Sequence, residues 1–312
     1  MASSGIGGQA VMEGVMMKNE DRYAVAVRKP DQNIDVEVKE YHSFCKIEAL
    51  RKIPIIRGVI SFVDSMVLGM GTLAHSATFF EDEPEEAEKE TADPEVKTTG
   101  KESKEKAVMG FTVFLAIIMA VAIFMVLPFY ISQLFQKVIA SETVVILLEG
   151  LVRLVIFFAY ILLISRMKDI QRVFMYHGAE HKCINCIEHG LELNVENVRK
   201  SSKEHKRCGT SFLFFVVIIS IIATLFIRVD SRLLRLVLRL AVIPLVAGVS
   251  YEFIKLAGRS ENPIVNLLSK PGLWMQKLTT REPDDDMIEV GIASVEAVFD
   301  WKAYIENEEN FR

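Results

Sequence analysis

The sequence predicts a mainly α-helical, polytopic membrane protein with about four transmembrane helices and a small cytoplasmic N-terminal unit that contains a β-hairpin. Residues 107–136 contain no charged side chain, and a helix needs only about 20 apolar residues to cross a bilayer. A second uncharged run covers residues 210–227. The mean hydropathy is +0.27 although 25% of the residues are charged, so apolar and charged residues are segregated along the chain.

Residues 1–52 are expected to form the β-containing cytoplasmic unit. Residues 22–29 and 34–40 alternate between apolar and polar side chains, and the turn-forming residues 30–33 separate them. This pattern predicts a β-hairpin. Because a lone hairpin is marginally stable, we expect it to pack against cytoplasmic helices.

Residues 53–80 are mostly apolar but include Arg57, Asp64 and His75. We expect a membrane-associated helix that lies at the membrane face, and a re-entrant segment or a core helix remains open. Residues 81–106 are rich in Glu, Lys and Thr and cannot bury enough apolar surface to fold alone. They are expected to form a flexible acidic linker.

A membrane bundle is expected over residues 107–260, with spans at about 108–135, 142–165, 210–228 and 233–256. Glu149 and Arg153 lie four residues apart inside the second span, where they can pair and reduce the cost of burying either charge. Residues 261–312 are expected to form two cytoplasmic helices. The Asp284–Asp286 triplet suits the first turn of the second helix better than a metal site.

Basic residues near the span ends predict the orientation. They precede the first and third spans and follow the second and fourth, although the arginines at 228–235 oppose this balance. We therefore expect a multi-pass protein of the cell membrane with both termini and the 166–209 loop in the cytoplasm. Met1 is not followed by a basic and then an apolar region, so we expect no cleaved signal peptide.

The net charge of −5 is mild, and much of the acid lies in residues 81–105. This distribution gives no basic patch, so nucleic acid is not an expected partner. Three of the four cysteines lie within residues 183–208. This clustering is typical of reduced thiols or metal ligands, not of a disulfide framework.

The sequence His177-Gly-Ala-Glu180-His181 is an H-x-x-E-H pattern. A helix is expected over about 169–188, where His177 and His181 lie one turn apart and can hold one metal ion. Glu180 lies beside them as a candidate catalytic base for a metal-bound water. His205, Cys208 or Glu188 could complete the ligand set.

A second pattern competes for the same ion. Cys183 and Cys186 with His205 and Cys208 form the ligand set of a structural zinc site. On a helix that continues to Glu188, the first two cysteines point away from His177 and cannot join its ion. A third interpretation is that these side chains only pack or form hydrogen bonds.

We therefore expect a metal-dependent hydrolase. Zinc or another divalent metal would ionise a bound water near neutral pH, and the substrate would be a peptide or a lipid-like molecule at the cytoplasmic membrane face. Membrane lipid is an expected partner, and homo-oligomerisation remains open. The alternatives are a non-enzymatic scaffold with a structural zinc site, which binds a partner protein, and a transporter. Few polar groups lie in the spans and no inverted repeat is evident, which disfavours the transporter.

Seven motifs stand out along the chain: GGQAVMEGVMM (7–17), AVRKPD (26–31), IRGV (56–59), YHGAEHK (176–182), HKRCGTSF (205–212), SYEF (250–253) and LTTREPDDDMIEV (278–290). With these motifs the chain resembles the YqhQ-like family of bacterial membrane proteins, which are described only as predicted metal-dependent enzymes. The resemblance implies that the YHGAEHK and H-x-R-C-G-T-S blocks belong together and that the Cys183/Cys186 pair is not required, which favours the histidine-based site. It also implies that Glu13 and the acidic DDD block share a cytoplasmic surface.

Overall fold

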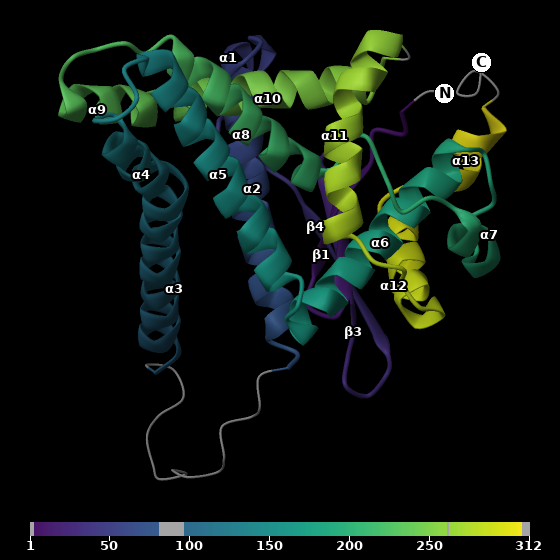
Figure 1. Cartoon of the computed structure of the whole chain (residues 1–312). Helices are drawn as coiled ribbons and strands as arrows, with labels where there is room; N and C mark the ends of the chain where they lie inside the picture. The colour runs from purple at the N-terminus through teal and green to yellow at the C-terminus, as the bar shows by residue number, and fades with distance from the viewer. Residues whose placement is uncertain (1–2, 81–96, 261, 308–312) are drawn as a thin grey trace. The chain divides into compact units, whose positions relative to one another are not determined.

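The computed structural model describes residues 3–80, 97–260 and 262–307, and within residues 97–109 it describes the side chain of Val108 alone. Helices dominate, and four strands form one sheet near the N-terminus (Figure 1). The strands are β1 (Gly7–Val11), β2 (Gly14–Asn19), β3 (Arg22–Arg28) and β4 (Ile34–Glu40). The helices are α1 (Glu48–Lys52), α2 (Ile56–Ala77), α3 (Lys97–Val121), α4 (Leu127–Phe135), α5 (Glu142–Ile164), α6 (Lys168–Glu188), α7 (Val195–Lys200), α8 (Gly209–Leu225), α9 (Arg232–Ala241), α10 (Ile243–Ala257), α11 (Pro263–Thr279), α12 (Asp285–Glu296) and α13 (Trp301–Glu306), with a π-helical turn over Ala122–Val126.

The chain divides into two compact units. The first comprises Met1–Phe80, Tyr160–Ala223 and Arg239–Arg312, and it contains the sheet and every candidate site residue. The second comprises Glu81–Ala159 and Thr224–Leu238, and it contains α3, α4 and most of α5 and α9.

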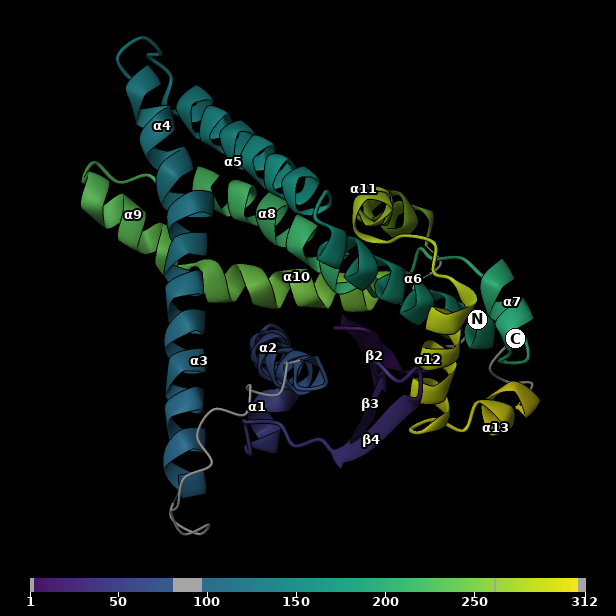
Figure 2. The same cartoon turned by 90° about the horizontal axis from the view of Figure 1, so that it is seen from below.

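The sheet is an antiparallel meander in the order β1-β2-β3-β4. The predicted hairpin is confirmed as β3 and β4, with Arg28 opposite Ile34. The sheet lies between α2 and α12 (Figure 2), so its central strands are buried on both faces. Val15 and Met17 belong to the core that includes α6 and α12, whereas Met16 belongs to the cluster on the α2 side.

Helix α2 crosses α10 at a steep angle. Figure 1 shows α2 from its side, whereas Figure 2 shows it nearly end-on, and α10 lies horizontally in both views. The crossing is close, since a Cβ on Gly58 would lie 2.8 Å from the carbonyl oxygen of Gly248. Arg57 donates two hydrogen bonds to Glu252, at 2.7 and 2.5 Å. Further along α2, Ser76 accepts a hydrogen bond from the backbone of Met12. Thus α2 packs against both α10 and the sheet.

Four helical stretches within the described residues are long and apolar enough to cross a bilayer. The number agrees with the prediction, but the set differs. Helix α8 has 17 residues and is shorter than the span expected at 210–228, whereas α2 meets the criterion. The last stretch is interrupted at Val242, just before Pro244, so it comprises two helices, α9 and α10. The stretches are Ile56–Ala77, Gly110–Phe135, Glu142–Ile164 and Arg232–Ala257.

Three further predictions concern the linker, the buried charges and the tail. Of the expected linker, residues 81–96 lie outside the described residues, and residues 97–106 belong to α3. The predicted Glu149–Arg153 pair is confirmed, at 3.0 Å with both side chains buried. The tail forms three helices within the described residues where two were expected, and Asp284 caps α12 by accepting a hydrogen bond from the backbone of Met287.

Candidate metal centre

Helix α6 carries two candidate metal ligands, His177 and His181. Its bounds, Lys168–Glu188, agree with the predicted helix over 169–188. His177 and His181 lie one turn apart on the same face, and their ring centroids are 4.4 Å apart. Tyr176 and Ala179 lie on the other side of the helix, in the core beneath the sheet. The helical period therefore separates the imidazoles from the apolar packing surface.

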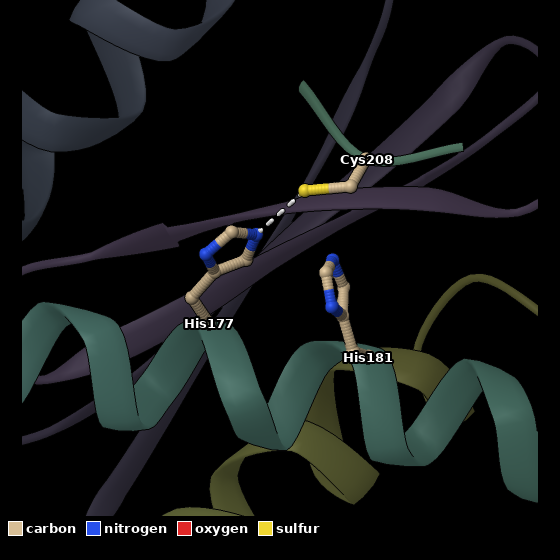
Figure 3. Close-up of side chains that lie close together, drawn as sticks. All are labelled: His177, His181 and Cys208. Atoms are coloured by element: carbon tan, nitrogen blue, oxygen red, sulfur yellow. Dashed lines mark hydrogen bonds between the residues drawn. The ribbon is translucent and has the colours of Figure 1, made fainter. Parts of the chain in front are cut away.

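Cys208 supplies the third donor. It lies directly before α8, and its Sγ is 3.2 Å from Nε2 of His177. One ligand atom each from His177, His181 and Cys208 lies within 4.8 Å of the other two. Figure 3 shows both rings rising from α6 toward the sulfur, which comes from a separate segment. His181 and Cys208 are buried and His177 is half-buried, so bulk water is largely excluded.

Backbone carbonyls orient both rings. Nδ1 of His177 lies 3.0 Å from the carbonyl oxygen of Thr279, and Nδ1 of His181 lies 2.7 Å from that of Lys203. Because a carbonyl only accepts hydrogen bonds, each Nδ1 carries the proton and donates. This leaves both Nε2 atoms available as ligands, and such partners on the second nitrogen are usual for metal-binding histidines.

The cysteine and the histidines shift each other's pKa. Burial alone would raise the pKa of Cys208, but the neighbouring imidazoles of His177 and His181 outweigh it and hold the pKa well below its usual range. Burial would likewise lower the pKa of His177, yet Cys208 raises it to about 9. The thiolate is the form of cysteine that binds metals. A metal ion would displace the extra imidazole proton on binding.

Two glycines let the backbone approach α6 at the site. A Cβ on Gly178 would lie 2.0 Å from the carbonyl oxygen of Arg281, and the backbone N–H of Arg281 donates to the carbonyl of Phe174. The segment that carries the Thr279 carbonyl therefore lies directly on α6. A Cβ on Gly8 would lie 2.9 Å from Cγ of Glu180, so β1 covers that carboxylate closely.

Glu180 is a buried carboxylate beside the three donors. Its relative exposure is 5%, and its Oε2 has no hydrogen-bond partner among the described residues. Burial raises the pKa of Glu180, although the charges of His177 and His181 oppose the shift. A buried carboxylate oxygen without a partner is costly, so packing alone does not account for this residue.

The structure pairs His205 with Glu188 and does not group either residue with the three donor atoms, although the ring centroids of His205 and His181 are 5.8 Å apart. Nε2 of His205 lies 3.2 Å from Glu188, and Arg207 donates to the same carboxylate at 2.5 Å. The backbone and side chain of Ser4 also donate to Glu188, each at 2.8 Å. Among the candidate third ligands, only Cys208 therefore joins the two histidines in this structure.

Cys183 and Cys186 lie in the core. Both are fully buried, and a Cβ on Gly291 of α12 would lie 2.9 Å from the Cys183 sulfur. Burial raises the pKa of both thiols, that of Cys186 to about 11. The prediction that they point away from His177 is confirmed. The four-ligand pattern with His205 and Cys208 is not formed.

The N-terminal and C-terminal motifs meet at a second place, on the Tyr176 side of α6. Glu13 forms a two-bond ion pair with Arg172 and accepts a hydrogen bond from Tyr176. Together with Asp284 and Asp286 these residues line a cavity of about 470 Å³. Glu13 and the acidic block therefore do share one surface, as the family resemblance implies.

Within the described residues, these features define a mainly helical protein with four long apolar helical stretches, a small antiparallel sheet and a largely buried His–His–Cys cluster. A family model described as "Protein of unknown function (DUF1385)" matches residues 53–301, and the chain belongs to this family. The chain is also 37% identical over 291 residues to "Uncharacterized protein YqhQ" of Bacillus subtilis (strain 168), which covers 92% of this chain and 90% of that protein. The comparison with solved structures gave no match.

Proposed function

We propose that this chain is a metal-dependent membrane hydrolase that binds zinc with His177, His181 and Cys208. Two imidazole nitrogens and a thiolate suit zinc better than magnesium or calcium, which prefer oxygen ligands. Three protein ligands leave a position open, as in catalytic zinc sites. The donor atoms lie within 4.8 Å of one another, and backbone carbonyls fix the orientation of both rings.

The observation that carries the hydrolase proposal is the buried carboxylate of Glu180, whose Oε2 has no hydrogen-bond partner among the described residues. A zinc ion held by His177, His181 and Cys208 would supply a Lewis acid that lowers the pKa of a water ligand. Glu180 follows His177 by three residues and precedes His181 by one, so it can take a proton from the attacking water and pass it to the leaving group. Burial raises the pKa of Glu180, which makes its carboxylate a stronger base than an exposed one.

The four apolar stretches support a membrane location. Basic residues near their ends favour a cytoplasmic position for both termini and for the 166–209 segment. The substrate would then be a peptide or a lipid-like molecule that reaches the site at the cytoplasmic membrane face.

One observation favours a second candidate, a scaffold in which the metal is structural. His181 and Cys208 are buried, and structural zinc sites are closed whereas catalytic ones stay open to substrate. In that case the metal would only fix the segment between α6 and α8, and Glu180 would have no chemical role.

Metal content and hydrolysis separate these candidates. Purified full-length protein should hold about one zinc per chain by elemental analysis, and His177→Ala should lose it while Cys183→Ala keeps it. Retention in His177→Ala or loss in Cys183→Ala would overturn the site. Glu180→Gln should keep the zinc but lose hydrolysis of a panel of membrane-derived peptides and lipid esters. Unchanged hydrolysis, or none by the wild type, favours the scaffold.

A further inference from the structure

A second, larger cavity lies away from the three donor residues. It has a volume of about 900 Å³ and lies where α1, the first half of α2, the end of α10 and the turn between β2 and β3 come together. Its basic lining residues are Lys18, Lys46, Arg51, Arg57 and Lys255, and its acidic ones are Glu20, Asp21, Glu48 and Asp64.

Much of this charge is already bound within the protein. Asp64 accepts hydrogen bonds from the Ser43 hydroxyl at 2.6 Å and from the Phe44 backbone at 3.0 Å. Arg57 is paired with Glu252. Glu48 forms an ion pair with Lys52 on α1. The ammonium of Lys18 lies over the ring of Tyr41.

Three basic side chains that line the cavity have no acidic partner among the described residues. Lys46, Arg51 and Lys255 form no ion pair with any residue that the structure describes, although all three line the same space. They come from α1, the residues before it and the end of α10. Three lining acids also lack an ion pair: Glu20 and Asp21, on the turn between β2 and β3, and Asp64 of α2, whose carboxylate accepts hydrogen bonds from Ser43 and Phe44. The α1 and α10 side of the cavity therefore presents unmatched positive charge.

Exposed apolar side chains flank these cations. Phe44, Ile47, Ile53 and Ile56 are between 39% and 58% exposed, within the same short stretch of chain that carries Lys46 and Arg51. Apolar side chains interspersed with basic ones are typical of segments that lie in the headgroup region of a membrane. Lys255 lies two residues before the end of the apolar stretch Arg232–Ala257. This position puts the cavity at the depth of the lipid headgroups if α10 spans the bilayer.

We propose that this cavity binds the phosphate-bearing headgroup of an anionic membrane phospholipid through Lys46, Arg51 and Lys255, while the acyl chains lie against the exposed apolar residues of the 44–56 segment. Anionic lipids are enriched on the cytoplasmic side of membranes and attract basic side chains there. The cavity is lined by none of the three proposed zinc ligands. The lipid proposal is therefore independent of the hydrolase proposal.

The test is lipid retention by the full-length protein in a neutral detergent, measured by native mass spectrometry with dioleoyl phosphatidylglycerol or dioleoyl phosphatidylcholine. Wild type should retain the phosphatidylglycerol preferentially. The double variant Arg51→Gln/Lys255→Gln should retain it about thirtyfold less, since each basic side chain near anionic lipid contributes about fivefold. Lys46→Glu/Arg51→Glu is a second variant, confined to exposed side chains and therefore safe for folding.

The matched control is Lys200→Gln/Lys302→Gln, which removes two exposed positive charges that neither line the cavity nor pair with a residue that lines it. It should leave retention unchanged. Equal retention of both lipids, an equal loss in the control, or no loss in either cavity variant would overturn the proposal.

A further experiment adds glycerol 3-phosphate or inorganic phosphate without lipid. If these bind with the same dependence on Arg51 and the lipid does not, the ligand is a free phosphate and the lipid proposal is wrong.

Discussion

Gly178 of α6 lies so close to Arg281 that a Cβ at position 178 would stand 2.0 Å from the Arg281 carbonyl oxygen. This oxygen belongs to the backbone, which cannot change its rotamer to make room as a long side chain can. Gly178→Ala should therefore push the segment after α11 away from α6, destabilise the protein by about 3 kcal/mol and lower the Tm by several degrees. Thermal unfolding in detergent measures this change.

Gly71→Ala is the matched control for this substitution. Gly71 also lies inside a helix, α2, but a Cβ there would meet nothing within 4 Å. Alanine should leave the Tm unchanged or raise it slightly, because glycine inside a helix is less favourable than alanine by about 0.5–1 kcal/mol. Equal effects of the two alanines would show that the approach of Arg281 does not determine stability.

The identity of the third metal ligand can be tested directly. Cys208 lies beside His177, whereas His205 is bound to Glu188. Cys208→Ala should therefore release zinc, and His205→Gln should retain it. Elemental analysis and cobalt substitution, in which a thiolate ligand gives a charge-transfer band, would follow both variants. If His205→Gln loses the metal and Cys208→Ala keeps it, the third ligand is His205 and not Cys208.

The buried pair of Glu149 and Arg153 gives a prediction for α5. Each side chain is about 3% exposed and they lie 3.0 Å apart. Glu149→Leu should destabilise the protein by about 3–5 kcal/mol, because it leaves the arginine charge buried without its carboxylate. Adding Arg153→Leu should recover most of that loss. Thermal unfolding of the single and double variants measures the difference, and a double variant less stable than Glu149→Leu would contradict it.

Glu188 makes stability depend on pH. Burial would raise its pKa, but the hydrogen bond from His205 and the charge of Arg207 outweigh it and hold the pKa at about 2. Since the folded pKa lies below the unfolded value of 4.5, the stabilisation is complete above about pH 5. It should be lost as the pH falls from about 5 to about 2, and it amounts to about 3 kcal/mol at most.

Unfolding measured across this pH range tests the prediction. The acid loss should be smaller in Glu188→Gln than in the wild type. Glu306→Gln, which changes an exposed carboxylate of α13, should keep the wild-type slope. The same acid slope in Glu188→Gln as in the wild type would assign the effect to other carboxylates.

Features with a local pattern were predictable from the sequence. The i,i+4 spacing of His177 and His181 placed both on one face of α6, and the helical period directed Cys183 to the opposite side. The alternating residues of β3 and β4 predicted the hairpin. Each of these depends on neighbours within about one turn or one strand pair, so the sequence contains the necessary information.

Features that depend on distant partners were not predictable. Strand β2 has apolar side chains on both faces because α2 and α12 cover it from opposite sides, so its sequence lacks the alternation that indicates a strand. The carbonyls that orient the histidines belong to Thr279 and Lys203, and any residue carries a carbonyl. The spacing along α6 does not exclude Glu188 as a ligand, and only its contacts with the distant Ser4 and with Arg207 show that its carboxylate is bound elsewhere.

The sheet and α12, one of the two helices that cover its core face, lie near opposite ends of the chain. β3 ends at Arg28, whereas α12 runs to Glu296. A ribosome that adds about 5–20 residues per second needs roughly 13–50 seconds to make the intervening stretch. Throughout that time Val15, Met17 and Ala26 lack α12, a partner in their finished core. The nascent N-terminal unit must therefore be shielded from aggregation until the apolar helices have been made, and slow translation prolongs that exposure.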